Sequence, residues 1–409
     1  MRADTKRNDA GDAEDLEAED LYDTVLVRYG EIGNKSSSVR SRLQRLLADR
    51  IRLTLDDREI EYNGIEVEWG RLFVDCDNVV DAAEAVADVF GVVRTSPAVR
   101  VDPEMDEMEN AAVSLVKAVG FDSGKFAVRP RSAGDHSFDS EDMGRKIGDA
   151  VWEAVEEPEV DLDDPELSVG VEAREDAAYV YVEEMEGVGG LPVGSQGRTV
   201  GLVSGGIDSP VAAWYSLRRG SSLVPIYLDL DPLVGEDHFE RARLAVEALS
   251  RYAPDVDEIW RVPTDGILLQ LFDEVERDRM IIYRRIMLRI AEAIAKKEDA
   301  EGIVTGESLG QKSSQTARNL RVTSEAVGMP VHRPLFGRDK TEITAKAREI
   351  GTYPTVDIDE GCASLAPHHP TTHADLEDVR EKEVGLSRDV EKLVLDAVER
   401  SEKVRVRRD

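Results

Sequence analysis

From Thr199 onward the sequence alternates between short apolar runs and amphipathic helical segments, and this alternation limits the fold more than any other feature. The predicted strands are TVGLVS, LVPIYLDL, DEIWRVP and GIVTGES, and the predicted helices lie near 209–219, 238–251, 265–276 and 279–298. Strands that are separated by helices pair in parallel, because each crossover helix returns the chain to the same edge of the sheet. We therefore predict an α/β domain at 198–409 with a doubly wound parallel sheet, whose site lies at the carboxyl ends of the strands.

The first half of the chain has the pattern of two small α+β units. The first unit combines a strand, a helix and two strands around Asn63-Gly64, and the second alternates strands and helices and contains the basic strand KFAVRPRSAG. The stretch EGVGGLPVGSQG lacks GxGxxG and a following helix, which favours a linker over a glycine-rich nucleotide loop. The predicted segments are a disordered acidic tail at 1–20, the two units at 21–78 and 79–185, and the linker at 186–197.

The net charge of −33 is strongly negative. A repulsive, disordered chain is one explanation, but the apolar fraction of 41% and the clear periodic segments favour a folded protein adapted to high salt. In molar salt, charges are screened within roughly 3 Å, so an acidic surface does not exclude a nucleic-acid partner. No run approaches the roughly 18 apolar residues of a membrane span, and the N-terminus lacks the apolar core of a signal peptide. We expect a cytoplasmic protein without a membrane partner.

The loop VGLVSGGIDSP, at 200–210, lies where the first strand of the predicted sheet turns into its first helix. Gly205 and Gly206 leave backbone N–H groups and the positive end of the helix open to an anion, an arrangement that binds phosphate. An ordinary tight turn would explain a lone Gly-Gly pair, but SGG-x-DS at this place is much rarer by chance. We therefore predict nucleotide binding here, although no Walker-type Gly-Lys-Ser/Thr follows.

SGGIDSP resembles the pyrophosphate loop of the ATP pyrophosphatases, which attach AMP to a substrate oxygen and release pyrophosphate. Other segments are similar, in the same order, to tRNA 4-thiouridine synthetases of the ThiI family: LVRYGEIGNKS, DPELSVGVEAR, GGLPVGSQG, YRRIMLRIAEAIA, TGESLGQKSSQT, RPLFGRDKTEI and IGTY. The resemblance implies that 21–78 is ferredoxin-like, 79–185 is a tRNA-binding THUMP domain, and 198–409 is the pyrophosphatase domain. It also implies the activity: ATP activates the C4 oxygen of a tRNA uridine, at position 8, and sulfur replaces it to give 4-thiouridine.

The resemblance implies roles for single residues. Asp208 would act in catalysis and hold Mg²⁺ through the pyrophosphate, and Lys340, in FGRDKTEI, would contact phosphate or the adenylate. ATP would be lined by the loop and the motifs that follow it: Leu202, Val203, Ser204, Gly205, Gly206, Asp208, Ser209, Tyr227, Leu228, Arg284, Gly306 and Gln315. The alternatives are an exposed first-turn lysine at Lys340 and a solvated helix face at Arg284.

The sequence holds two cysteines, Cys76 and Cys362. The resemblance places a sulfur-handling cysteine in IDEGCASLAPHHP, so we expect Cys362 to be catalytic, with an inert buried thiol as the alternative. Cys76 ends the apolar strand RLFVDC and is expected to be structural. His368 and His369 are expected to be loop residues, because HH with one cysteine is a weak metal-ligand set. Two cysteines outside a CxxC motif argue against an iron-sulfur cluster. Without the rhodanese domain of many bacterial members, we expect no second catalytic cysteine.

Partners follow from the same resemblance and from charge. The dense basic clusters of the front half are expected to face tRNA phosphates, although solvated surface is the alternative. They are Lys125, Arg129 and Arg131 in KFAVRPR, and Arg42, Arg45 and Arg50 in RSRLQRLLADRIR. The sulfur donor would be a persulfide or sulfide source, such as a cysteine desulfurase or free sulfide. A homodimer and a role in thiazole formation for thiamine are left open.

Two other functions compete with 4-thiouridine synthesis. One is a related enzyme that performs 2-thiolation or amide formation, against which the front domains that resemble THUMP argue. The other is a tRNA-binding protein that keeps ATP as a structural ligand, against which the intact SGGIDS loop and Cys362 argue.

Overall fold

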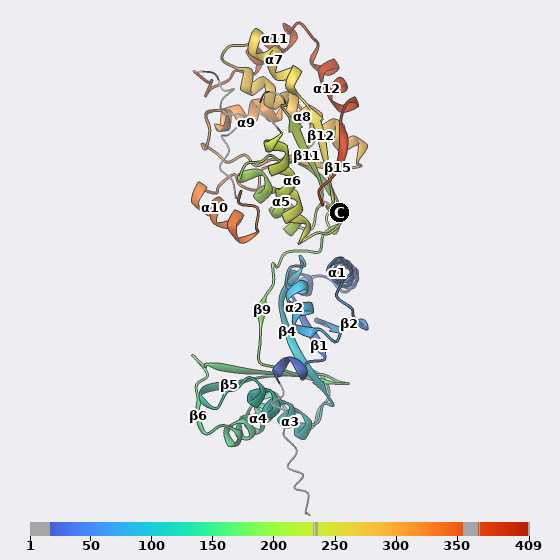
Figure 1. Cartoon of the computed structure of the whole chain (residues 1–409), viewed down its shortest axis with the longest axis vertical. Coiled ribbons are helices and arrows are strands. Elements are labelled where there is room, and N and C mark those ends of the chain that lie inside the picture. The colour runs from blue at the N-terminus through green and yellow to red at the C-terminus, as the bar shows by residue number, and fades with distance from the viewer. Residues whose placement is uncertain (1–16, 232, 234–235, 355–366, 368, 408–409) are drawn as a thin grey trace, which may run out of the picture. The chain divides into compact units, whose positions relative to one another are not determined.

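The computed structural model describes residues 17–231, 233, 236–354, 367 and 369–407 (Figure 1). Its chain divides into two compact units that each combine several segments. The first unit is drawn from 1–29, 58–87 and 92–187, and the second from 30–57, 88–91 and 188–409. Cys362, His368 and most of the predicted tail lie outside the described residues. The last residues of that tail, Ala18–Asp20, form a 3₁₀ turn instead of a disordered segment.

The first unit is built on one mixed sheet with the strand order β2-β3-β1-β4-β8-β7-β5-β6, and β9 also pairs with β4. Its strands are β1 Thr24–Tyr29, β2 Gly64–Glu68, β3 Arg71–Asp75, β4 Val92–Val101, β5 Ser123–Ser132, β6 Glu157–Val160, β7 Leu167–Ala173, β8 Ala178–Tyr181 and β9 Met185–Glu186. Its helices are α2 Val79–Ala87, α3 Met105–Ala118 and α4 Ser140–Ala154. The long strand β4 pairs with β1 through its first part and with β8 through its last residues, so it belongs to both halves of the sheet.

The hairpin between β2 and β3 corrects one expectation. The register pairs Gly64 with Asp75 and Glu68 with Arg71, so the two-residue turn falls at Trp69-Gly70 and not at Asn63-Gly64. Gly70 has a φ of +86°, which glycine adopts without strain and which suits a tight hairpin turn. Asn63 lies at the open end of the hairpin, where its backbone N–H donates to the Asp75 carbonyl at 2.7 Å.

The second unit contains the predicted parallel sheet, with the strand order β14-β13-β10-β11-β12-β15. Its strands are β10 Arg198–Leu202, β11 Ser222–Asp229, β12 Glu258–Pro263, β13 Gly302–Val304, β14 Val331–His332 and β15 Glu402–Arg405. The first five pair in parallel, which confirms the predicted fold class. The edge strand β15 runs antiparallel to β12 and was not predicted, because its sequence EKVR has too few apolar residues to show a strand period.

Helices cover both faces of this sheet. They are α5 Asp208–Arg218, α6 Asp237–Ser250, α7 Asp265–Glu274, α8 Arg279–Lys297, α9 Ala317–Ser324, α10 Lys340–Glu349, α11 Leu376–Val384 and α12 Val390–Glu399. The unit also includes α1 Ser37–Asp57 and the 3₁₀ turns Glu31–Asn34 and Ser313–Gln315. Successive residues Ile303 and Val304 of β13 belong to two different buried clusters, one with α8 and one with α5. Among the described helices, none is both long and apolar enough to cross a membrane.

Candidate functional site

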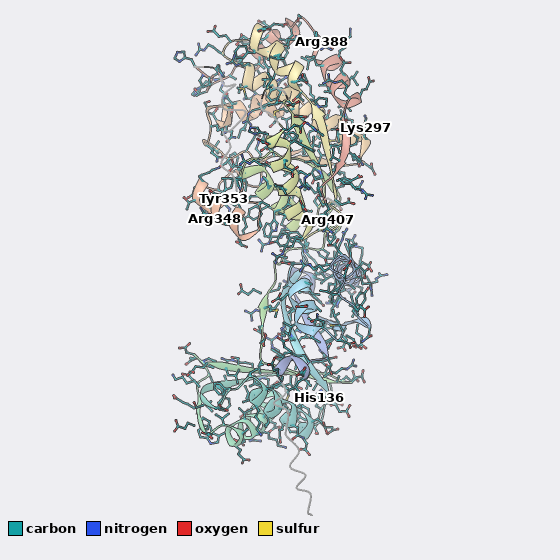
Figure 2. All side chains as sticks on the ribbon, in the orientation of Figure 1. His136, Lys297, Arg348, Tyr353, Arg388 and Arg407 are labelled. Carbon is teal, nitrogen blue, oxygen red and sulfur yellow. The ribbon has the colours of Figure 1, made fainter. Side chains whose placement is uncertain are left out.

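A pocket of about 410 Å³ lies at the carboxyl ends of β10, β11 and β13. The chain runs from β10 outward to β11 and β12 and then returns to β13 on the other side of β10. This reversal is the point at which open α/β sheets bind their ligands. Tyr353, labelled in Figure 2, follows α10 and lines the pocket, and the Arg348 guanidinium lies 4.8 Å from the centre of its ring.

The structure brings the predicted nucleotide-lining residues together in this one pocket. They are Leu202, Val203, Ser204, Gly205, Gly206, Asp208, Ser209, Tyr227, Leu228, Arg284, Gly306 and Gln315, and Lys340 lines it too. The roles assigned to these residues stay predictions, because their positions give proximity and not function. Cys362 lies outside the described residues.

The loop between β10 and α5 is closed by a pair of serines. The Ser204 backbone N–H donates to Ser209 Oγ at 2.8 Å, and the two hydroxyls lie 3.0 Å apart. A side chain at Gly205 would meet α6, because its Cβ would lie 2.9 Å from Arg241 Cβ. Since α5 begins at Asp208, the unsatisfied N–H groups of its first turn and its positive dipole end adjoin this loop. The loop therefore has the geometry of an anion-binding turn.

Asp208 and Lys340, predicted from separate motifs, are in contact. Lys340 Nζ lies 2.9 Å from Asp208 Oδ1, and Gln311 Nε2 lies 3.3 Å from Asp208 Oδ2. The described residues contain no cluster of three or more His, Cys, Asp or Glu side chains that could hold a metal. Mg²⁺ that binds together with phosphates needs only one or two protein carboxylates. The site therefore fits a metal that enters with a polyphosphate, held through Asp208.

Glu307 is a buried member of the pocket wall that the sequence analysis missed. Its side chain is 8% exposed, forms an ion pair with Arg284, and accepts from Arg333 Nε at 2.7 Å. Burial raises the pKa of this carboxyl, but the Arg284 and Arg333 charges outweigh burial and hold its pKa below the usual value. Arg284 is therefore not on a solvated helix face. The one sequence feature that could have indicated a role for Glu307 is its position directly after Gly306 in TGES.

Two buried polar atoms in the wall have no hydrogen-bond partner among the described residues. Gln315 is 5% exposed, and its Oε1 has no hydrogen-bond partner among the described residues. Nε of Arg284 likewise has none within the described part of the chain. Buried donors and acceptors are normally satisfied, so a ligand with both kinds of group would complete this wall. At Gly306 a Cβ would lie 2.6 Å from the Ser209 nitrogen, so glycine keeps the loop after β13 close to α5. These residues and this volume fit a nucleotide.

The predicted basic residues of the first unit lie on β5. Val128 and Pro130 face α4, where they approach Gly148 and Gly144. Lys125, Arg129 and Arg131 alternate with them and so belong to the opposite face of the sheet. Arg129 and Arg131 are exposed, and Arg129 donates to the Leu162 carbonyl at 2.6 Å, while Lys125 pairs with Asp161 at 2.8 Å.

On α1 the predicted basic residues divide into two kinds. Arg42 and Arg45 are exposed and lie one turn apart on the helix. Arg50 instead contacts Asp255 at 2.7 Å and donates to the Val193 carbonyl at 2.9 Å. The expectation that Arg50 faces RNA is therefore wrong, because its guanidinium is used inside the second unit.

Cys76 and His369 behave as predicted. Cys76 is 2% exposed after β3, and burial, with the neighbouring Asp75 and Asp77, raises the pKa of its thiol to about 12. A thiol in that state is protonated and inert at neutral pH. His369 is exposed in an irregular bend.

Comparisons with known proteins agree with this architecture. Three family models match: the ThiI ferredoxin-like domain at 24–96, the THUMP domain at 103–183, and the thiamine biosynthesis protein (ThiI) at 194–387. A probable tRNA sulfurtransferase of Halobacterium salinarum is 48% identical over 365 residues, which cover 88% of this chain and 93% of the relative. Another, from Methanosarcina mazei, is 39% identical over 380 residues, which cover 91% and 93%.

Solved structures extend the likeness to three dimensions. A 4-thiouridine synthetase in complex with RNA and bound ATP matches with a TM-score of 0.83 and 30% identity, over 94% of this chain and 99% of that one. The protein PH1313 of Pyrococcus horikoshii matches with a TM-score of 0.65 and 26% identity, over 80% and 99%. With relatives of this identity over most of its length, the chain belongs to the tRNA sulfurtransferase (ThiI) family.

Proposed function

We propose that the chain is an ATP-dependent tRNA sulfurtransferase that activates C4 of a tRNA uridine as an adenylate and replaces the oxygen with sulfur. The resemblance in the sequence points to uridine 8 and to 4-thiouridine as the product. The carrying observation is the convergence of the SGGIDS loop, Asp208 and Lys340 on the pocket at the switch point of the sheet. The names of the relatives and the RNA and ATP of the similar synthetase complex support it.

The residues of the pocket would contact different parts of the bound ATP, according to their chemistry. An oxygen on a pyrimidine ring leaves poorly, and ATP as a substrate supplies AMP, a good leaving group. The loop amides, the start of α5 and Lys340 stabilise the charge of the departing phosphates. Asp208 would hold the Mg²⁺ that accompanies those phosphates. Tyr227 and Leu228 line the pocket near the end of β11, where the adenine would lie.

Cys362 would carry the sulfur as a persulfide or take part in its displacement. A persulfide donor, such as a cysteine desulfurase, would pass its outer sulfur to the Cys362 thiol and keep its own thiol. Sulfide itself, the alternative donor, would instead displace AMP from the adenylate directly. Neither of the two cysteines lies in a CxxC motif, which supports a cycle without an iron-sulfur cluster. We place the enzyme in the cytoplasm, where its tRNA substrate is found, and leave a homodimer open.

One reaction tests the proposal. A tRNA transcript is incubated with the full chain, ATP, Mg²⁺ and sulfide in concentrated salt, and its nucleosides are analysed by mass spectrometry. We expect 4-thiouridine, together with AMP and pyrophosphate. 2-Thiouridine or an amide product would replace the proposal by the related chemistries. ATP binding without tRNA-dependent pyrophosphate release would replace it by a non-catalytic RNA-binding protein.

We expect Gly306→Ala to weaken ATP binding by about tenfold or more, because backbone must move to admit the methyl group. The added Cβ would lie 2.6 Å from the Ser209 nitrogen and 2.7 Å from its Cα, and neither atom can rotate away. Calorimetric titration with ATP measures the change. Gly337→Ala is the control, since no atom lies within 4 Å of its Cβ. Equal ATP affinities of the two variants would contradict the close packing of this loop against α5.

We expect joint reversal of Arg129 and Arg131 to Glu to weaken tRNA binding at moderate salt. Each lost phosphate contact should also lower the slope of log affinity against log salt by about 1. Filter binding over a salt series measures both quantities. Arg145→Glu is the control, because this exposed arginine lies on α4, away from the β5 face that carries the pair. An unchanged slope of log affinity against log salt in the double variant would show that Arg129 and Arg131 do not contact tRNA phosphates.

A further inference from the structure

One carboxylate in the pocket wall has no role in the proposed chemistry, and it faces two guanidinium groups. Glu307 pairs with Arg284 from α8 and with Arg333 from the segment after β14. Thr305 Oγ1 also donates to its Oε2 at 3.2 Å. Two positive charges against one negative charge give these three residues together a net charge of +1.

The two arginines differ in how many of their donors have partners. Arg333 uses Nε for Glu307 and donates through Nη2 to Ser324 Oγ at 2.9 Å. Arg284 donates to Glu307 through Nη1 only, and its buried Nε has no partner within the described part of the chain. Arg284 and Glu307 line the pocket side by side. Arg284 lines the pocket and Arg333 does not, so a ligand in the pocket that offers a hydrogen-bond acceptor would meet the Arg284 guanidinium.

We propose that Glu307 is a positioning residue that holds the Arg284 guanidinium against an acceptor atom of the bound nucleotide and thereby sets the affinity for ATP. This inference rests on the proposed function and deepens it. Without the carboxylate, two like charges would share a buried wall, and their repulsion would turn Arg284 away from its position. Arg284 contacts the nucleotide in this scheme, and Glu307 acts only through Arg284.

A simpler role for Glu307, neutralising the wall, predicts the opposite result. If Glu307 only reduced positive charge near a polyphosphate, its replacement by Gln would make the wall more positive and bind ATP more tightly. If it positions Arg284, the same replacement weakens ATP binding. The direction of the change therefore separates the two roles.

The adjacent residue on α8 offers a matched control. Arg285 pairs with Glu325 at 3.0 Å and with Glu383 at 2.8 Å, away from the pocket lining. Glu325→Gln removes a carboxylate from an arginine of the same helix without touching the pocket. It should leave ATP affinity unchanged.

The experiment is calorimetric titration of the full chain with ATP and Mg²⁺, without tRNA. We expect Glu307→Gln to raise the Kd for ATP by about tenfold, the effect of one charge-assisted hydrogen bond. Affinity for tRNA should stay that of the unmodified chain. In an Arg284→Gln background, Glu307→Gln should cause no further loss, because it acts through a side chain that is absent. If Glu307→Gln does not fold, Glu307→Asp keeps the charge on a shorter side chain and should give a smaller rise in Kd.

Tighter or unchanged ATP binding by Glu307→Gln, or equal losses in the two backgrounds, would overturn the inference. The proposed function fails separately. An unmodified chain that binds ATP but forms no 4-thiouridine would contradict the sulfurtransferase proposal and leave the ATP measurement on Glu307 valid. A chain that thiolates tRNA while Glu307→Gln binds ATP normally would contradict only the role of Glu307.

Discussion

Asp208→Ala should reduce tRNA-dependent pyrophosphate release by a factor on the order of 100 or more, because it removes the carboxylate that we propose holds Mg²⁺. The carboxylate lies at the start of α5, within 2.9 Å of Lys340 Nζ, where the leaving phosphates would bind. Its loss would remove the carboxylate that pairs with Lys340 and, on the proposed mechanism, the protein ligand of Mg²⁺. Binding of tRNA should stay close to normal, since the basic residues expected to meet RNA lie on β5 and α1.

An acidic residue at the start of another helix of the second unit provides the control for Asp208→Ala. Asp265 is the first residue of α7 and has a similarly sheltered side chain, 30% exposed against 23% for Asp208. Each acid favours its helix through the macrodipole by about 0.3–1 kcal/mol. Asp265→Ala should show that small loss of stability with pyrophosphate release intact. Equal pyrophosphate release by the two variants would remove Asp208 from the chemistry.

The sheet of the second unit was predictable because its order follows from local pattern. Each helix predicted at 209–219, 238–251, 265–276 and 279–298 begins and ends within two residues of α5, α6, α7 and α8. Apolar strands between amphipathic helices have few arrangements, and the right-handed crossover rule removes most of them. The strand β15 was not predicted, because an edge strand that pairs antiparallel needs no apolar period in its own sequence.

Sequence motifs predicted which residues line the site. They did not predict the contacts between residues that lie far apart in the sequence. The SGGIDS loop indicated nucleotide binding from its residues alone. The contact between Asp208 and Lys340 joins positions 132 residues apart. Glu307 meets Arg333 from another strand end, a pairing that no spacing in the sequence encodes. Arg50 was predicted to face RNA but contacts Asp255 instead. A run of basic residues in the sequence does not show which arginine forms such internal contacts.

With a persulfide donor as the sulfur source, Cys362→Ser should stop 4-thiouridine formation and leave ATP-dependent pyrophosphate release intact. Activation of the oxygen needs only the loop, the metal and ATP, whereas a hydroxyl cannot form a persulfide. The substitution keeps the size of the side chain, so it tests chemistry and not packing. Nucleoside mass spectrometry and a pyrophosphate assay on the same reaction measure the two steps separately.

Cys76→Ser is the matched control, because Cys76 is the other cysteine of the sequence. Because the Cys76 thiol is buried, its replacement should lower the free energy of unfolding by on the order of 1 kcal/mol and leave thiolation unchanged. Since Cys76 is buried and is not expected to form the disulfide that would release sulfur, turnover should require an external reductant or sulfide. If Cys362→Ser makes 4-thiouridine at the normal rate from the persulfide donor, then sulfur reaches the adenylate without Cys362. Sulfur transfer would in that case depend on the nucleotide pocket alone, and the cysteine would have no part in it.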